Sequence, residues 1–185
     1  NQPHYNIHLL NKEQYQQIVY DWNKTFEEFP KNKTIHELFE QQVEKTPNNV
    51  ALIFEDEKMT YSELNQKSNQ LAYYLRNQGV KSNSLVALCL EKGFDMIISI
   101  LGVLKAGGAY VPIDPQIPKD RIEYIIEDTK TKYVITQTQH EFLFSLCFQG
   151  FIVLIDDDKL FQPILLKQCV DNIMLLNEEE TNLSQ

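Results

Sequence analysis

The sequence is poor in arginine and carries an excess of acidic residues. Only Arg76 and Arg121 are arginines among its 185 residues, and the formal net charge is −9. Affinity for a phosphate backbone comes largely from clustered lysine and arginine side chains. The composition therefore argues against nucleic acid as a partner.

Paired cysteines, a leader-like start and long apolar runs are missing too. The three cysteines, Cys89, Cys147 and Cys169, are far apart and form no C-x-x-C pair. This spacing is typical of proteins in a reducing cytoplasm, and it does not indicate a zinc site. No stretch approaches the roughly 18 apolar residues that a membrane span needs. We therefore expect a cytoplasmic chain without a membrane partner. Because it begins without Met and ends in a polar run, 178–185, we also expect a piece of a longer protein.

Four common catalytic or phosphate-binding motifs do not occur. These are G-x-G-x-x-G, G-x-x-x-x-G-K-[ST], H-E-x-x-H and G-x-S-x-G. A dinucleotide loop, a Walker-type phosphate loop, a zinc-protease site and a serine-hydrolase elbow are thus unsupported.

What is present is the composition of an ordinary globular domain. Hydrophobic residues make up 43% of the chain, and its length suits one domain with a substantial core. The first 33 residues differ from the rest and are predicted to form a linker. Asn11 can cap a short helix with one apolar stripe, and Pro30 interrupts the polar segment that follows. The stripe consists of Tyr15, Ile18, Val19 and Trp22.

From residue 34 onward, helix signals become clear. Thr34 with Glu37 and Thr60 with Glu63 are capping boxes, and each precedes a helical apolar pattern. A short strand over 50–54 lies between the two helices. Further strands are predicted at 85–90, 109–113, 133–136 and 151–155, and further helices at 94–105, 119–129 and 141–147.

This alternation predicts an α/β fold, with an open, mostly parallel sheet flanked by helices. We assign residues 34–155 to this part of an incomplete domain. Residues 156–185 form a poorly defined tail or a truncated continuation.

Isolated polar residues offer only weak site signals. His4 and His8 are four residues apart but lack an acidic partner at ligand spacing, so a surface pair is favoured over a metal site. His36 is expected to be an ordinary residue of a first helical turn. The acidic triplet 156–158 follows the strand predicted at 151–155. Ligands of open parallel sheets often bind at the carboxyl ends of strands, so the triplet could hold a ribose or a cation, although a solvated turn is the commoner outcome.

The most distinctive segment is Leu104-Lys105-Ala106-Gly107-Gly108-Ala109-Tyr110-Val111-Pro112-Ile113-Asp114-Pro115. Two glycines allow a chain to leave a buried helix through a tight turn and enter a strand. A phosphate site is disfavoured, because the glycine pair follows a helix instead of preceding one. The physical interpretation is a helix-to-strand corner.

At these residues the sequence resembles the adenylation domains of nonribosomal peptide synthetases, within the adenylate-forming enzymes. Met59 to Asn65 is similar to the family's first core motif, and Leu104 to Asp114 is similar to its second. The segment from Leu9 to Phe39 is similar to the linker between a condensation and an adenylation domain. The residues singled out as family structural motifs are Thr60, Tyr61, Glu63, Leu64, Leu104, Lys105, Ala106, Gly107, Gly108, Tyr110, Pro112 and Asp114.

The resemblance implies a parent protein that activates an amino acid with ATP and magnesium. The aminoacyl adenylate would then be loaded onto the phosphopantetheine thiol of a carrier domain. In this family the phosphate loop, the adenine-contacting segment, the ribose-binding aspartate, the catalytic lysine and the amino-acid pocket lie downstream of both motifs. We therefore assign no catalytic, cofactor-binding or metal residue to this chain and expect it to be inactive alone.

The resemblance also implies partners: an upstream condensation domain, and the remaining adenylation and carrier domains downstream. Two other interpretations stay open. The apolar stripe of Tyr15, Ile18 and Trp22 would suit a scaffold or interaction module, and the alternation alone would suit a small flavodoxin-like ligand binder. A truncated parallel sheet leaves an uncovered edge, which favours self-association.

Overall fold

The computed structural model describes residues 10–144 and 148–157. The chain divides into two compact units, residues 1–33 and 34–185, and each is described by itself. No helix in the described ranges combines the length and the apolar character that a membrane crossing needs.

The first unit contains the predicted capped helix, which ends in an unexpected way. In α1, Lys12–Gln16, Asn11 and Gln14 form a reciprocal capping box with N···O distances of 2.7 and 3.1 Å. The predicted helix continues as a π-helical turn, η2, Gln17–Asp21, in which Trp22 N donates to Gln17 O. The Asn23 amide donates to the carbonyls of Ile18 and Val19, which helps to satisfy this wider turn. The side chains of the apolar stripe are exposed to solvent, and the exposed fraction of Trp22 is 65%.

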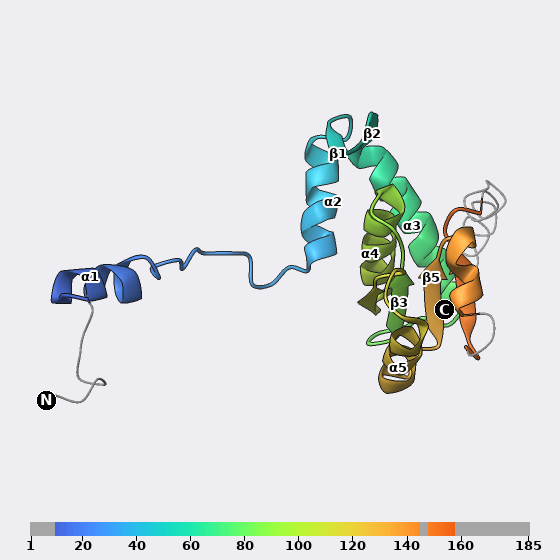
Figure 1. The fold of residues 1–185 in the computed structure, drawn as a ribbon. Helices are drawn as coiled ribbons and strands as arrows, with labels where there is room; N and C mark the ends of the chain where they lie inside the picture. Colours follow the sequence, from blue (N-terminus) through green and yellow to red (C-terminus); the bar gives the residue numbers. More distant parts are fainter. Residues whose placement is uncertain (1–9, 145–147, 158–185) are drawn as a thin grey trace, which may run out of the picture. The chain divides into compact units, whose positions relative to one another are not determined.

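The second unit is built on a parallel sheet, as predicted (Figure 1). Its strands are β3, Leu85–Cys89, β4, Ala109–Ile113, β5, Tyr133–Thr136, and β6, Phe151–Leu154. Their order is β4-β3-β5-β6, and every neighbouring pair is parallel. Because β4 is an edge strand within the described residues, the missing N–H of Pro112 can face away from the ladder.

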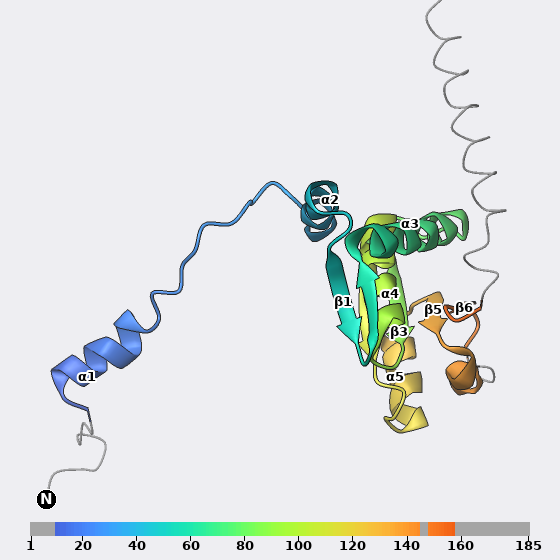
Figure 2. The same cartoon turned by 90° about the horizontal axis from the view of Figure 1, so that it is seen from above.

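Helices cover both faces of this sheet. On one face, α3, Tyr61–Asn77, lies beside α4, Phe94–Ala106 (Figure 2). On the other, α5, Lys119–Thr129, contributes Ile122 to a separate core cluster. Strand β3 alternates between the clusters: Val86 and Leu88 belong to the first, Ala87 and Cys89 to the second. Burial on both faces explains why this strand is apolar throughout.

The α3–α4 contact depends on a glycine that sequence analysis did not single out. A Cβ atom on Gly102 would lie 2.7 Å from Leu71 Cδ2, and Leu71 is fully buried. The missing side chain therefore allows the two helices to approach closely.

The segment before α3 departs from the prediction. Helix α2, Ile35–Lys45, and strand β1, Val50–Phe54, form as expected. A second strand, β2, Glu57–Thr60, pairs antiparallel with β1 and makes a separate two-stranded sheet. Its sequence, EKMT, lacks the apolar alternation that would have indicated a strand.

The helix predicted at 141–147 is also corrected. The structure has a 3-10 helix, η3, Thr138–Leu143, which begins three residues earlier. The predicted residues 145–147 and the tail from Asp158 to Gln185 lie outside the described residues. Thr138 starts η3 early because its N–H and hydroxyl groups both donate to the carboxylate of Asp156.

Candidate functional site

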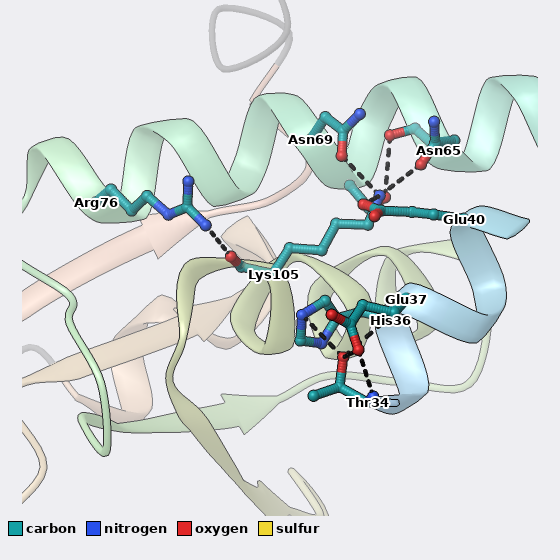
Figure 3. Close-up of polar contacts among 9 residues, drawn as sticks. Thr34, His36, Glu37, Glu40, Asn65, Asn69, Arg76 and Lys105 are labelled. Carbon is teal, nitrogen blue, oxygen red and sulfur yellow. Dashed lines mark hydrogen bonds and ion pairs between the residues drawn. The ribbon is translucent and has the colours of Figure 1, made fainter. Parts of the chain in front are cut away.

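The two motif segments meet through the side chain of Lys105. This lysine lies in the last turn of α4, and its ammonium group donates to the side-chain oxygen of Asn65 on α3 (Figure 3). Asn65 ends the first motif segment, Met59 to Asn65, and Lys105 lies in the second, Leu104 to Asp114. The structure thus brings together segments that are separated by about forty residues.

The first motif forms the beginning of α3. Thr60 Oγ1 accepts from Glu63 N at 3.2 Å, and Glu63 Oε2 accepts from Thr60 N at 2.8 Å. The Thr60 backbone N–H and, secondarily, the Thr60 hydroxyl both donate to the Glu63 carboxylate, which lowers the pKa of that carboxyl. Leu64 is buried, and the Tyr61 ring lies 6.0 Å from that of Phe39. The predicted capping box is confirmed.

The second motif forms the predicted helix-to-strand corner. Leu104, Lys105 and Ala106 end α4, and Gly107 follows with a φ of +90°. A Cβ atom on Gly108 would lie 3.0 Å from Ser84 O, so this position requires close backbone packing. Tyr110 and Pro112 lie in β4, and Asp114 follows it.

Burial dominates the electrostatics of Lys105. Its side chain is only 5% exposed, and it also contacts Asn69 Oδ1 at 2.6 Å and Glu40 Oε1 at 3.2 Å. Its ammonium lies 5.3 Å from the centre of the Phe39 ring. Desolvation lowers the pKa of Lys105, although the hydrogen bond and the charge of Glu40 oppose that shift.

An open polar cleft of about 410 Å³ lies beside this lysine. It is bordered by His36 and Glu40 of α2 and by Asn69 and Arg76 of α3. The Arg76 guanidinium donates to the backbone oxygen of Lys105, which ties α3 to the end of α4. His36 Nε2 lies 3.2 Å from Thr34 Oγ1, within the first helical turn that the sequence predicted.

A second cleft, of about 590 Å³, lies at the carboxyl ends of β3 and β4. Its polar lining includes Glu91, Lys92 and Asp114, but the Asp114 carboxylate already accepts a hydrogen bond from Gln116 N at 2.9 Å. In the ranges 10–144 and 148–157, no group of three or more His, Cys, Asp or Glu side chains is arranged to hold a metal. Neither cleft supplies a glycine-rich turn leading into a helix, so these residues do not fit ATP with magnesium.

The acidic triplet behaves mainly as a structural turn where it is described. Asp156 binds Thr138 N at 2.9 and 3.0 Å, so its carboxylate holds the loop between β5 and η3. Asp157 is exposed, while Asp158, His4 and His8 lie outside the described residues. Beyond the carboxyl ends of β3 and β5, His140 Nε2 lies 3.3 Å from Glu91 Oε1, and the Gln137 side-chain amide donates to the Asp95 carboxylate.

Sequence reasoning missed the partners of Lys105 outside its own segment. Asn65 and Asn69 are four residues apart on α3, so a shared helical face was detectable. Nothing local indicated that this face would receive a lysine from α4 and a carboxylate from α2.

Comparisons with known proteins assign the chain to a family. Residues 39–180 match the family of AMP-binding enzymes. The chain is 46% identical over 153 residues to gramicidin S synthase 2 of Brevibacillus brevis, covering 83% of this chain and 3% of that protein. It is 50% identical over 121 residues to bacitracin synthase 1 of Bacillus licheniformis, covering 65% of this chain and 2% of that protein. The chain therefore spans only a few per cent of these relatives.

Solved structures agree with this assignment. The crystal structure of the nonribosomal peptide synthetase FmoA3 matches 75% of this chain and 15% of its own, with 30% identity and a TM-score of 0.68. The N-terminal subdomain of Klebsiella oxytoca NpsA has the same fold, with 24% identity, a TM-score of 0.60 and coverage of 70% of this chain and 31% of its own. The chain belongs to the family of AMP-binding enzymes and matches the N-terminal part of the adenylation domains of nonribosomal peptide synthetases.

Proposed function

We propose that the protein containing these residues activates an amino acid for peptide synthesis. The substrate carboxylate attacks the α-phosphate of ATP in the presence of magnesium, which gives an aminoacyl adenylate and releases pyrophosphate. The acyl group then passes to a phosphopantetheine thiol on a carrier domain. The observation that carries this proposal is the 46% identity over 153 residues to gramicidin S synthase 2.

Within that protein, this chain supplies a structural frame. Support comes from the two motif segments, whose described contacts are capping, packing and turn contacts and the polar contacts of Lys105 with neighbouring helices. Thr60 caps α3, which the residues from Tyr61 to Leu64 begin. The residues from Leu104 to Asp114 comprise the end of α4, the corner that follows it, strand β4 and the residue after it. We assign these motif residues structural roles and assign no catalytic residue to the chain.

The proposed partners follow the order of domains that the resemblance implies. A condensation domain precedes the linker, residues 1–33, and the rest of the adenylation domain and a carrier domain follow. The complete protein is cytoplasmic. The comparisons do not favour the alternative that the chain is a scaffold module, despite the exposed stripe of Tyr15, Ile18 and Trp22.

Self-association of the isolated chain is a further part of this proposal. In the described part of the chain, β6 pairs on one side only, with β5. Its sequence, FIVL, carries no charged residue or proline to discourage edge pairing. Light scattering at increasing concentration should show a rising mass, and a constant monomer mass would contradict this part.

Amino-acid-dependent exchange of pyrophosphate into ATP tests the proposed reaction. The complete protein should catalyse exchange with one amino acid or a small group from a panel of twenty, and the 185-residue chain with none. No exchange by the complete, folded protein with any amino acid would count against activation. Exchange by the short chain alone would refute its assignment as a frame.

A further inference from the structure

Helix α2 is held on the α/β body by few apolar contacts. None of its residues is buried. Ile35 is 70% exposed and Leu38 is 38% exposed, so Phe39 is its main apolar contribution to the first core cluster. Because burial of apolar area is the usual means of fixing a helix, α2 needs another restraint.

The ammonium group of Lys105 provides such a restraint. It comes from α4, and its acceptors come from both neighbouring helices: Glu40 of α2, and Asn65 and Asn69 of α3. An ammonium has three N–H donors, so these acceptors can satisfy all of them. The Phe39 ring, also from α2, lies 5.3 Å from the same nitrogen.

This arrangement fixes the position of α2 more than it adds to the free energy of unfolding. Burying a lysine costs desolvation energy, which its ion pair and hydrogen bonds largely offset. Glu40 retains 45% exposure of its side chain, and Asn69 is also exposed, so water can solvate both if the lysine is removed. The hydrogen bonds to Asn65 and Asn69 hold the ammonium on α3, and the directional contact with Glu40 exists only when α2 lies in one place.

We propose that Lys105 is a positioning residue that fixes α2 on the α3–α4 pair. Helix α2 is the first element of the second unit, so Lys105 determines where the polypeptide enters that unit. This inference concerns the architecture of the chain itself and does not depend on the reaction of the complete protein.

Amide hydrogen exchange combined with urea unfolding of the 185-residue chain tests the proposal. In Lys105→Met, amides of residues 39–45 should exchange about tenfold faster or more, because hydrogen bonds to a charged group are lost. The urea midpoint should change little, and exchange in β3 and β5 should stay as in the original chain. Lys81→Met is the matched control, since Lys81 is exposed and lies outside the three helices.

Unchanged exchange in α2 would overturn the proposal. So would a lowered urea midpoint accompanied by faster exchange throughout the unit, because that pattern marks a purely stabilising residue. The conservative substitution Glu40→Gln tests the same restraint if Lys105→Met fails to fold. It should accelerate exchange in α2 alone, whereas Glu44→Gln, on an exposed side of the same helix, should not; equal effects would overturn the proposal.

Discussion

The Lys105 ammonium donates a hydrogen bond to the side-chain oxygen of Asn65, which lies forty residues earlier in the chain. This contact joins the end of α4 to the N-terminal part of α3, and with them the two motif segments. Arg76, further along α3, donates to the backbone oxygen of the same lysine. The two segments that resemble core motifs of adenylation domains thus contact one another in the fold.

The corner after α4 requires a residue that tolerates a positive φ. We expect Gly107→Ala to lower the free energy of unfolding by about 1–2 kcal/mol, because an L side chain is strained in this conformation. The space itself is open, since a Cβ atom would lie 3.6 Å from its nearest neighbour, Ser82 N. Gly107→Asn should therefore cost less than Gly107→Ala. Equal losses in urea unfolding would contradict backbone strain as the cause.

Close packing of α3 and α4 requires the absence of a side chain at Gly102. Gly102→Ala should lower the free energy of unfolding by about 1–2 kcal/mol, because overpacking outweighs the gain in helix propensity. A double-mutant cycle with Leu71→Ala isolates the cause. In that background the cost of the alanine at 102 should be smaller, since the Leu71 Cδ2 and Cγ atoms are gone and only the Cβ atom of residue 71, 3.1 Å away, remains. The same cost in both backgrounds would contradict the packing explanation.

The Glu63 capping contact predicts a pH dependence of stability. Its pKa is lowered from 4.5 by hydrogen bonds from Thr60, so the ionised form is favoured in the folded state. The contribution to stability is therefore present above the unfolded pKa and is lost as pH falls through the folded pKa. The difference in unfolding free energy between the original chain and Glu63→Gln should shrink from about pH 7 to about pH 3.

Glu127→Gln is the control for this titration, because it removes the same charge from an exposed position on α5. The difference in unfolding free energy between the original chain and Glu127→Gln should vary less with pH than the difference between the original chain and Glu63→Gln. A pH-independent difference for Glu63→Gln would show that its carboxylate does not act as a capping group in solution.

Cys89 should be unreactive in the folded chain. Burial, and secondarily the charge of Asp114, raises the pKa of its thiol to about 11, and the residue is fully buried. Because the thiolate is the reactive form, iodoacetamide at about pH 8 should spare Cys89 until the chain is unfolded in urea. Mass spectrometry of the tryptic peptide 82–92, which contains no other cysteine, reports this directly. Equal labelling rates in the folded and unfolded chains would contradict burial of Cys89.

Local signals in the sequence were sufficient for most of the fold. The capping boxes at Thr34 and Thr60 located the starts of α2 and α3, and the strand predicted at 85–90 is present as β3. Strand β2 was missed because its short polar sequence is held by pairing with β1, which is a tertiary effect. Likewise, η3 starts early because of Asp156, eighteen residues later.

The surroundings of Lys105 were less predictable. The sequence placed this lysine in a helix that is apolar on nearly all sides, and such a helix is buried. It did not reveal which polar groups would accompany the lysine into the interior. Those groups come from α2 and α3, so only the packing of three helices brings Glu40, Asn65 and Asn69 together.

Calorimetric titration of the 185-residue chain with ATP and magnesium tests the central claim most directly. Neither cleft offers a phosphate cradle, and the described residues contain no metal cluster, so the account predicts no saturable heat of binding. Saturable binding in the micromolar range would contradict the assignment of this chain as a structural frame. It would direct attention to the cleft beside Asp114, at the carboxyl ends of β3 and β4.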